Sequence, residues 1–485
     1  MLKIKGRRGT QARRHDDSNG LVLFFHAFAL LRFRAGFIFV MFCAATFMAK
    51  AQITVTTLAG DNSNGSLIAA IQSANAQKAS PDKPVTILFD NKLAGEIVLS
   101  MDLPAIENHI SLTGNVVNGK PSITINGSVN PAINEGLKGG VSPGFSLFVV
   151  KQGKTFSVEN LHLTKSNKSG IVNEGGNVTV KNCMFTYNMG IGSIHGTGGA
   201  IQSEAGNLTV SGTYFFYNTG GVGGTDGGIG YGGAGGINVV NGNAVIINSS
   251  FVENEGGFGG VGVGSVGGAG AVMVRGGNVA MANSTVAGNF GGGSIVTGAS
   301  GGCVMLGGNM LISHATIVNN MGGVGLGGFD GVDFCSGGVH VLAGTLTLCS
   351  TILAGNQNGA DEETDIECQV SGEVRSSGYN LTGKGKVTLN GTGDMQGVAM
   401  NQVIATTSEG KYQSGIISGF LPTVSLSANS PAKNKGIEIS TLNPVSSTDN
   451  GARFFIDAWN AFSSLLKADQ NGTKRAAKPS IGAVE

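Results

Sequence analysis

The sequence predicts an all-β protein whose short strands stack into a parallel β-helix, and three observations favour this fold. One phrase occurs six times and always places an asparagine 17 residues after a hydrophobic opening residue. The glycine-rich connections between successive phrases vary from 13 to 19 residues. No run inside the phrases has the spacing or length of a helix. A constant part joined to a variable part is typical of a solenoid. The phrases open at Ile171, Ile201, Ile237, Val272, Cys303 and Val339, and they end at Asn188, Asn218, Asn254, Asn289, Asn320 and Asn356.

Each phrase predicts two short strands and a turn. Between Asn207 and Asn218, the apolar residues Leu208, Val210 and Phe215 are interleaved with polar residues, as in a half-buried strand. Parallel strands in an ordinary sheet need crossover helices, and the phrases contain none. We therefore expect each phrase to form one coil of the β-helix.

The asparagine that ends each phrase is predicted to lie at a corner of its coil. Asparagine tolerates the left-handed backbone region, and its amide can bond to the asparagine of the next coil. Stacked in register, these amides would form a ladder along the solenoid axis. The glycine-rich connections are expected to bulge as loops on a single face, and faces with such insertions are often functional.

Residues 1–51 are predicted to be a cleavable signal peptide that takes no part in the fold. Basic residues precede an apolar run from Ala35 to Met48, and Ala49 and Ala51 frame a cleavage site after Ala51. The run is short for a membrane span. We expect the mature chain to be secreted, or held at the cell surface or outer membrane. It retains 22 basic and 28 acidic residues, a net charge of −6, which argues against nucleic acid as a partner.

The segments before the phrases are predicted to cap and begin the solenoid. Gly65–Ala76 has helical periodicity and Ser66 can cap it, so this helix would shield the strand edges of the first coil. Ile110–Thr113, Ile123–Asn126 and Thr155–Leu163 have the pattern of earlier coils. We expect an N-terminal cap with the first coils over 52–135, the β-helix with its glycine-rich loops over 136–360, and a C-terminal region that completes and caps the solenoid over 361–485.

Three sets of residues resemble known protein groups. Phe185–Asn188 and the matching ends of the next two phrases resemble the GGAI and FxxN repeats of polymorphic outer-membrane proteins and other β-helix surface proteins. Ile53–Ile71 is similar to the CSLREAI motif of exported bacterial β-helix proteins, although the Cys, Arg and Glu of that motif are absent. Gly378–Thr382 and Ile481–Glu485 resemble parts of the choice-of-anchor Q domain. These resemblances imply a single-stranded, right-handed, pectate-lyase-like β-helix that acts at a bacterial surface, and we expect it to be a monomer.

Residues that could catalyse a reaction are few. Glycosidases need paired carboxylates, which on a solenoid would occupy equivalent positions of adjacent coils. The positions equivalent to Glu204 are held by Val240, Arg275, Leu306 and Leu342. His195, His314 and His340 are isolated from other candidate groups. We therefore predict no catalytic residue.

Calcium is the one cofactor for which the sequence offers candidate ligands. Clustered carboxylates bind this ion through hard oxygen atoms, although such runs more often form solvated loops. Asp330 and Asp333 lie together in a glycine-rich loop. The denser run consists of Asp361, Glu362, Glu363, Asp365 and Glu367.

The cysteines of the mature chain are few and lack metal-binding spacing. Cys183 and Cys303 are expected to pack as small apolar side chains. Cys335, Cys349 and Cys368 are close enough in sequence to allow one disulfide in an oxidising compartment, and their pairing is left open.

The predicted function is binding without catalysis. We expect an adhesion-type scaffold that recognises carbohydrate or another cell-surface ligand through its glycine-rich loop face or an exposed strand face. A diverged polysaccharide lyase or glycoside hydrolase on the same fold is the alternative. A purely structural envelope protein fits the sequence equally well.

Overall fold

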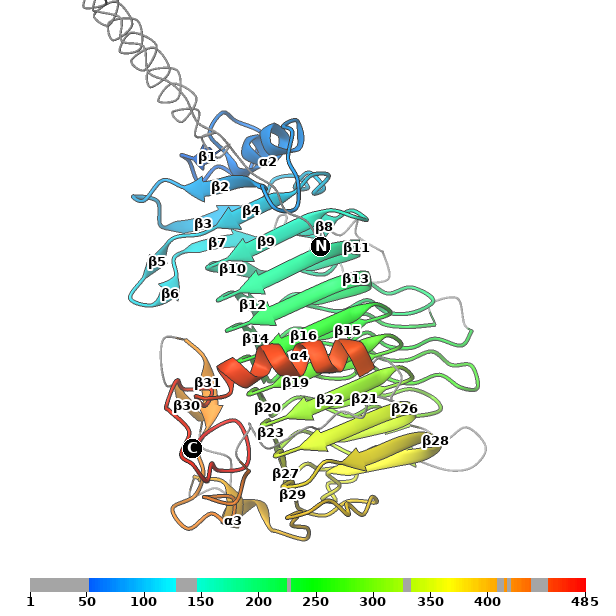
Figure 1. Cartoon of the computed structure of the whole chain (residues 1–485). Helices are drawn as coiled ribbons and strands as arrows, with labels where there is room; N and C mark the ends of the chain where they lie inside the picture. The colour runs from blue at the N-terminus through cyan, green and yellow to red at the C-terminus, as the bar shows by residue number, and fades with distance from the viewer. Residues whose placement is uncertain are drawn as a thin grey trace, which may run out of the picture. The chain divides into compact units, whose positions relative to one another are not determined.

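Two long parallel sheets dominate the part of the chain that the computed structural model describes (Figure 1). The described residues are 52–127, 146–224, 228–325, 333–407, 414–416, 420–437 and 452–485. They belong to one compact unit of residues 51–485. The predicted signal peptide and its cleavage site after Ala51 lie outside the described residues.

The strands of both sheets follow the repeated phrases. The first sheet contains β1 (Gln52–Val55), β2 (Val85–Phe89), β4 (Ile110–Thr113), β8 (Phe148–Val150), β9 (Thr155–Glu159), β11 (Ile171–Lys181), β13 (Ile201–Ser211), β15 (Ile237–Val239), β16 (Asn243–Ile247), β18 (Val272–Val274), β19 (Asn278–Ala282), β21 (Cys303–Met305), β22 (Asn309–Ser313), β26 (Val339–Cys349) and β28 (Ile366–Ser376). The second contains β3 (Gly95–Val98), β7 (Ile123–Asn126), β10 (Leu161–Thr164), β12 (Met184–Thr186), β14 (Tyr214–Phe216), β17 (Ser250–Val252), β20 (Thr285–Ala287), β23 (Thr316–Val318), β27 (Ile352–Ala354) and β29 (Leu381–Thr382). Short antiparallel pairs are formed by β5 (Val116–Val117) with β6 (Lys120–Pro121), β24 (Val324–Gly325) with β25 (Asp333–Phe334), and β30 (Ser414–Ile416) with β31 (Pro422–Val424).

Equivalent residues of successive phrases lie beside one another. Ile201 pairs with Ile171 on one side and with Ile237 on the other, and all of these pairings are parallel. Each phrase therefore winds once around the axis and contributes strands to both sheets. The predicted parallel β-helix is confirmed, and its coils have the right-handed sense usual for parallel crossovers. The earlier coils predicted before the phrases correspond to β4, β7, β9 and β10.

The core lies between the two sheets and consists of stacked, identical positions. Phe185, Phe215 and Phe251 are fully buried in neighbouring coils. Their rings stack with centroids 5.2 Å and 4.5 Å apart. Because parallel register repeats each inward position once per coil, a favourable apolar contact is repeated along the axis.

The corner before each ladder asparagine uses the left-handed backbone region, but the residue that adopts it differs from the prediction. The asparagines that end the phrases do not have positive φ angles; the residue before each of them does. These residues have φ between 51° and 66° and are Tyr187, Tyr217, Glu253, Gly288, Asn319 and Gly355. Lys165, one coil earlier, has the same backbone conformation before Ser166, with φ of 55°. The asparagine is thereby left free to point its amide inward, and the preceding side chain points outward.

The predicted N-terminal helix is confirmed as α2 (Leu67–Asn75). The hydroxyl of Ser66 accepts a hydrogen bond from the backbone N–H of Ala69 at 3.2 Å, which satisfies one free donor of the first turn. Leu67, Ile68 and Ile71 are buried, and the helix packs against β1 and β2. It covers the start of the solenoid as expected.

The glycine-rich connections form loops that are joined into a hydrogen-bonded layer. The outgoing and returning parts of successive connections bond to each other through their backbones at 2.7–3.0 Å. The chain of bonds runs through Thr197, Gly221, Gly233, Gly257, Gly268, Gly292, Ala299 and Gly323. A Cβ atom on Gly257 would lie 1.9 Å from the carbonyl oxygen of Gly221. Only glycine allows backbones to approach so closely.

This glycine layer covers the outer side of the strands that open the phrases. Ala234, Ala269 and Ala299 of the layer pack against Met273 of β18 and Val304 of β21. The opening strands are therefore buried on both sides, as their burial patterns show. Their outward side chains are unavailable to a ligand.

The C-terminal part of the chain folds back over the second half of the solenoid, a feature absent from the sequence prediction. Helix α4 (Ala452–Leu465) lies across β16 and β19 (Figure 1). Its residues Phe455, Trp459 and Phe462 pack on outward apolar side chains of the first sheet. These partners are Val245, Ile247, Ala280, Ala282 and Leu311. A short helix, α3 (Met400–Val403), also belongs to this region.

Polar contacts fix the end of the chain to the solenoid. The buried guanidinium of Arg475 donates through Nη2 to Oδ1 of Asn283 at 2.8 Å and to the carbonyl of Gly482 at 2.9 Å. Its Nη1 lies 3.7 Å from Oε1 of Glu485. On the second sheet, Ile481 packs with Val318 and other outward residues. No helix among the described residues is long and apolar enough to cross a membrane.

The five cysteines of the described chain form no disulfide with one another. Burial raises the pKa of Cys183, Cys303 and Cys349 to about 12, and Cys335 is also buried. Cys368 is partly exposed.

We expect a maleimide reagent at pH 8 to label Cys368 and to leave the other four thiols unmodified until the chain unfolds, because only accessible thiolate reacts. Mass spectrometry of peptides from the labelled chain of residues 52–485 would check this. Labelling of Cys335 or Cys349 in the folded chain would contradict it.

Candidate binding face

The second sheet has one stretch of outer surface that no described residue covers. From β17 onward, the C-terminal segment lies on this surface: Ser250 donates to the carbonyl of Pro422 at 2.6 Å, and Thr285 donates to Gln470 at 2.6 Å. Before β17, the outward residues of β3, β7, β10, β12 and β14 remain exposed or half-buried, except for Asn126, Thr164 and Thr186, which are buried. We call this uncovered stretch the open face.

Four aromatic side chains form a patch at the end of the open face. Tyr187 and Tyr217 are 52% and 45% exposed, and their rings lie nearly parallel with centroids 5.5 Å apart. Phe216 contacts Tyr217 at 4.2 Å and Tyr214 at 5.4 Å between ring centroids. We call Tyr187, Tyr214, Phe216 and Tyr217 the aromatic patch. Tyr214 and Phe216 are half-buried, and a contiguous, partly exposed aromatic group of this kind is typical of a binding surface.

The fold explains why two of these rings face solvent. Tyr187 and Tyr217 occupy the left-handed corner, with φ of 54° and 51°, so their side chains leave the coil outward. The same corner row holds Lys165 before them and Glu253 after them. A hydrogen bond to Glu253 raises the pKa of Tyr217, so the phenol stays protonated at neutral pH.

A row of hydroxyl and imidazole groups lies next to the aromatic patch. The ring of His162 bridges two threonines, with Nδ1 3.2 Å from the hydroxyl of Thr124 and Nε2 2.8 Å from that of Thr186. Burial is the main cause that lowers the pKa of His162, which keeps the imidazole neutral. Thr186 lies opposite Phe216 in the sheet register. Neutral polar groups therefore adjoin the rings.

The six asparagines that end the phrases form one buried ladder. In each step, the side-chain Nδ2 donates to Oδ1 of the next asparagine at 2.8–2.9 Å. The backbone N–H donates to the same oxygen at 2.9–3.1 Å. The second Nδ2 hydrogen reaches a carbonyl of the preceding coil, such as that of Phe215 for Asn254. All six amides are at most 1% exposed, so the ladder holds the corner and is not itself a binding site.

The ladder ends at a carboxylate. Oδ1 of Asp365 accepts from the backbone N–H and from Nδ2 of Asn356 at 3.1 Å and 2.7 Å. Its Oδ2 is buried and has no hydrogen-bond partner among the described residues. Burial first, and also the carboxylate of Glu363, raise the pKa of Asp365 well above its usual range. A Cβ atom on Gly383 would lie 2.2 Å from Oε1 of Glu363 and 2.7 Å from Oδ2 of Asp365, so the two oxygens are within 4.9 Å of each other.

The acidic run proposed to bind calcium is dispersed by the fold. Asp361 and Glu362 are exposed and Asp365 is buried at the ladder end. Glu367 pairs with Lys386 at 2.6 Å. Within the described ranges, no group of three or more His, Cys, Asp or Glu side chains could hold a metal ion. Asp330 and the side chain of Asp333 lie outside those ranges. Calcium binding by this run stays a prediction.

The histidines singled out in the sequence lie in three different settings. His195 stacks on Tyr231 with ring centroids 4.7 Å apart, and the guanidinium of Arg275 lies 5.3 Å from the same ring. His314 is fully buried, and burial first, then Arg475, lowers its pKa well below the usual value. His340 is fully buried and pairs with Val304 in the first sheet. The structure brings none of them to the open face.

Sequence reasoning missed the aromatic patch and a second asparagine ladder. The second ladder runs on the outer side of the first sheet through Asn177, Asn207, Asn243, Asn278 and Asn309, with side-chain bonds of 2.7–3.1 Å. Its signal was present, because these residues share one position of the phrase. The patch had a weaker signal: Tyr214 and Phe216 of β14 hold outward positions that are Ser, Thr, Ile, Val or Ala in later coils.

Comparison with known proteins gives a likeness of fold only. No known protein family matches the sequence, and no curated protein is similar to it in sequence. The structure is similar to the crystal structure of pectate lyase Pel9A, with 14% identity, a TM-score of 0.44, and coverage of 90% of this chain and 97% of that chain. We draw nothing about activity from a likeness at this level. The resemblances to polymorphic outer-membrane repeats, the CSLREAI motif and the choice-of-anchor Q domain stay predictions.

Proposed function

We propose that the protein binds carbohydrate on the aromatic patch and acts as an adhesion-type scaffold outside the cell, after removal of residues 1–51. The observation that supports this most directly is the stacked, half-exposed pair Tyr187 and Tyr217. The pair lies on the open face, whereas the rest of the second sheet is covered by the C-terminal segment. Aromatic faces carry partial negative charge and attract the partially positive C–H groups of a sugar ring.

The groups around the patch favour a sugar over a charged ligand. The hydroxyl of Thr124 retains hydrogen-bonding capacity beside the neutral ring of His162, without net charge. The one basic and one acidic residue of the corner row, Lys165 and Glu253, lie at opposite ends of the tyrosine pair. A neutral, hydroxyl-rich chain that lies across the rings would use both kinds of contact.

The test is a glycan-binding screen on the chain of residues 52–485, followed by titration of the best glycan. We expect Tyr187→Ala/Tyr217→Ala to weaken binding about tenfold or more, since each ring contact contributes roughly 0.5–1.5 kcal/mol. The matched control is Phe258→Ala, which removes a ring that is 42% exposed on the glycine layer. It should leave affinity unchanged.

Two outcomes would count against this proposal. Equal affinity of the double variant and the parent would place the binding site elsewhere. A parallel assay with polygalacturonate checks the alternative of a lyase or hydrolase: release of unsaturated or reducing ends, abolished by substitution of one carboxylate, would replace binding with catalysis.

A further inference from the structure

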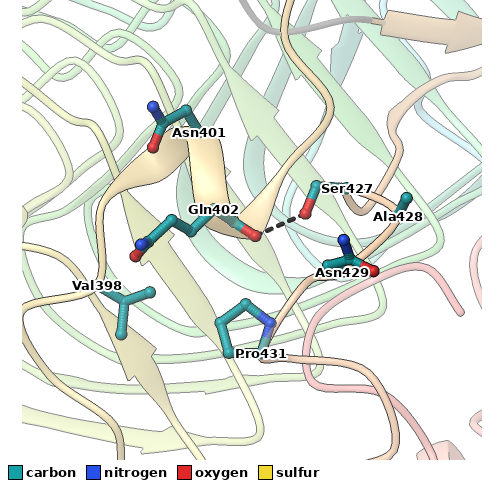
Figure 2. A pocket seen from close by; sticks show the side chains of 7 residues that line it. All are labelled: Val398, Asn401, Gln402, Ser427, Ala428, Asn429 and Pro431. Carbon is teal, nitrogen blue, oxygen red and sulfur yellow. Dashed lines mark hydrogen bonds between the residues drawn. The ribbon is translucent and has the colours of Figure 1, made fainter.

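The C-terminal region contains a pocket that is separate from the aromatic patch. It has a volume of 660 Å³, within the range of about 300–1,000 Å³ usual for small-molecule sites. Figure 2 shows its wall formed by α3 on one side and by the segment 427–431 on the other. The residues that line it are Val398, Asn401, Gln402, Ser427, Ala428, Asn429 and Pro431.

Hydrogen bonds join the two walls of the pocket. The hydroxyl of Ser427 donates to the carbonyl of Gln402 at 2.6 Å (Figure 2), and its backbone N–H donates to the carbonyl of Val403 at 3.0 Å. Val403 and Ala432, which flank the walls, are fully buried in the apolar cluster below. The backbone of both walls is therefore fixed by the fold, and the side chains of Asn401, Gln402 and Asn429 are exposed on it.

The lining combines amides with small apolar groups and contains no charged residue. The side-chain amides of Asn401, Gln402 and Asn429 make no hydrogen bond to any described residue, so their donors and acceptors are available. Val398 and Pro431 provide apolar surface beside them (Figure 2). Each amide offers both an N–H₂ donor and a carbonyl acceptor, which matches hydroxyl groups, since these also donate and accept.

We propose that this pocket binds a neutral, hydroxyl-rich small molecule, such as one or two sugar units, independently of the aromatic patch. A carboxylate or phosphate would find no cation among the lining side chains to offset its loss of water. The ammonium of Lys433 lies beside the lining, but it donates to the carbonyl of Ala428 at 3.1 Å. A purely apolar ligand would leave three amides without partners. A neutral saccharide satisfies both conditions.

The test uses saturation-transfer NMR and calorimetry on the chain of residues 52–485, with cellobiose and maltose as neutral probes and galacturonate as the charged probe. We expect a neutral probe to bind and galacturonate not to bind. Gln402→Ala/Asn429→Ala should weaken the neutral probe at least tenfold. Gln369→Ala, which removes an exposed amide on β28, is the matched control and should change nothing.

The result also separates this pocket from the proposed carbohydrate face. Binding that is lost in Gln402→Ala/Asn429→Ala and kept in Tyr187→Ala/Tyr217→Ala supports the pocket, whatever happens at the patch. The reverse pattern overturns the pocket and leaves the patch standing. Absence of saturation transfer from both neutral probes, or equal binding of galacturonate, also overturns it.

Discussion

Asn254→Ala is expected to lower the free energy of unfolding by about 3–5 kcal/mol. The substitution removes the acceptor of two hydrogen bonds from Asn218 and the donor to Asn289 and to the carbonyl of Phe215. These partners are buried, so water cannot replace the lost bonds, and each unsatisfied group costs roughly 1–3 kcal/mol. Urea titration followed by circular dichroism measures the loss.

The exposed ladder provides the matched control. Asn243 makes the same pair of side-chain bonds, with Asn207 and Asn278 at 3.1 Å and 3.0 Å, but on the outer surface. Asn243→Ala should cost less than about 1 kcal/mol because water reaches both partners. Equal losses in the two variants would mean that burial does not decide the strength of these ladders.

Asp365→Asn is expected to stabilise the protein at pH 8 by about 1–2 kcal/mol. The new side chain keeps the acceptor used by Asn356 and places an N–H₂ group near the carboxylate of Glu363. The buried Oδ2 that lacks a partner is thereby replaced by a donor with an acceptor within reach. The variant adds one more rung to the ladder.

The stability gained by Asp365→Asn is expected to depend on pH. Because the folded pKa of Asp365 lies above the unfolded value, the native state binds the proton more tightly. Its contribution to stability is therefore complete below about pH 4 and is lost as the pH rises through the folded pKa. The stability difference between Asp365→Asn and the parent should grow with pH, as calorimetry in a pH series would show. A difference that is constant with pH, or that shrinks as pH rises, would contradict a protonated Asp365.

The coil, its register and its core could be predicted because they depend on positions that recur. Ile201 and Phe215 have apolar equivalents one phrase away on each side, and inward packing follows from that recurrence. The hydrogen bonding within the glycine layer could not be predicted, because glycine-rich sequence is compatible both with open loops and with close backbone stacking. Distinguishing these needs the hydrogen-bond partner of each connection, and that partner lies in the neighbouring coil.

The open face could not be predicted, because its extent depends on which strands the C-terminal segment covers. Tyr214 and Ser250 hold the same outward position in adjacent coils, yet only the second is covered by the C-terminal segment. The cover depends on how α4 and the residues after it fold back, and they carry no repeat. A hint was present: outward residues change from Thr209 in β13 to Val245 in β16, which favours burial under another element.

The glycine layer changes how the composition of this chain should be interpreted. Segments so rich in glycine usually behave as flexible linkers that proteases cut readily. Here the carbonyl of Gly221 and the backbone of Gly257 meet with no space for a side chain, so a substitution in one connection disturbs both neighbours. Few single substitutions of these glycines are therefore tolerated. An insertion into this layer is accommodated most easily when it adds a complete coil. The low complexity of the sequence therefore results from a steric requirement, because the close approach of neighbouring backbones admits only glycine.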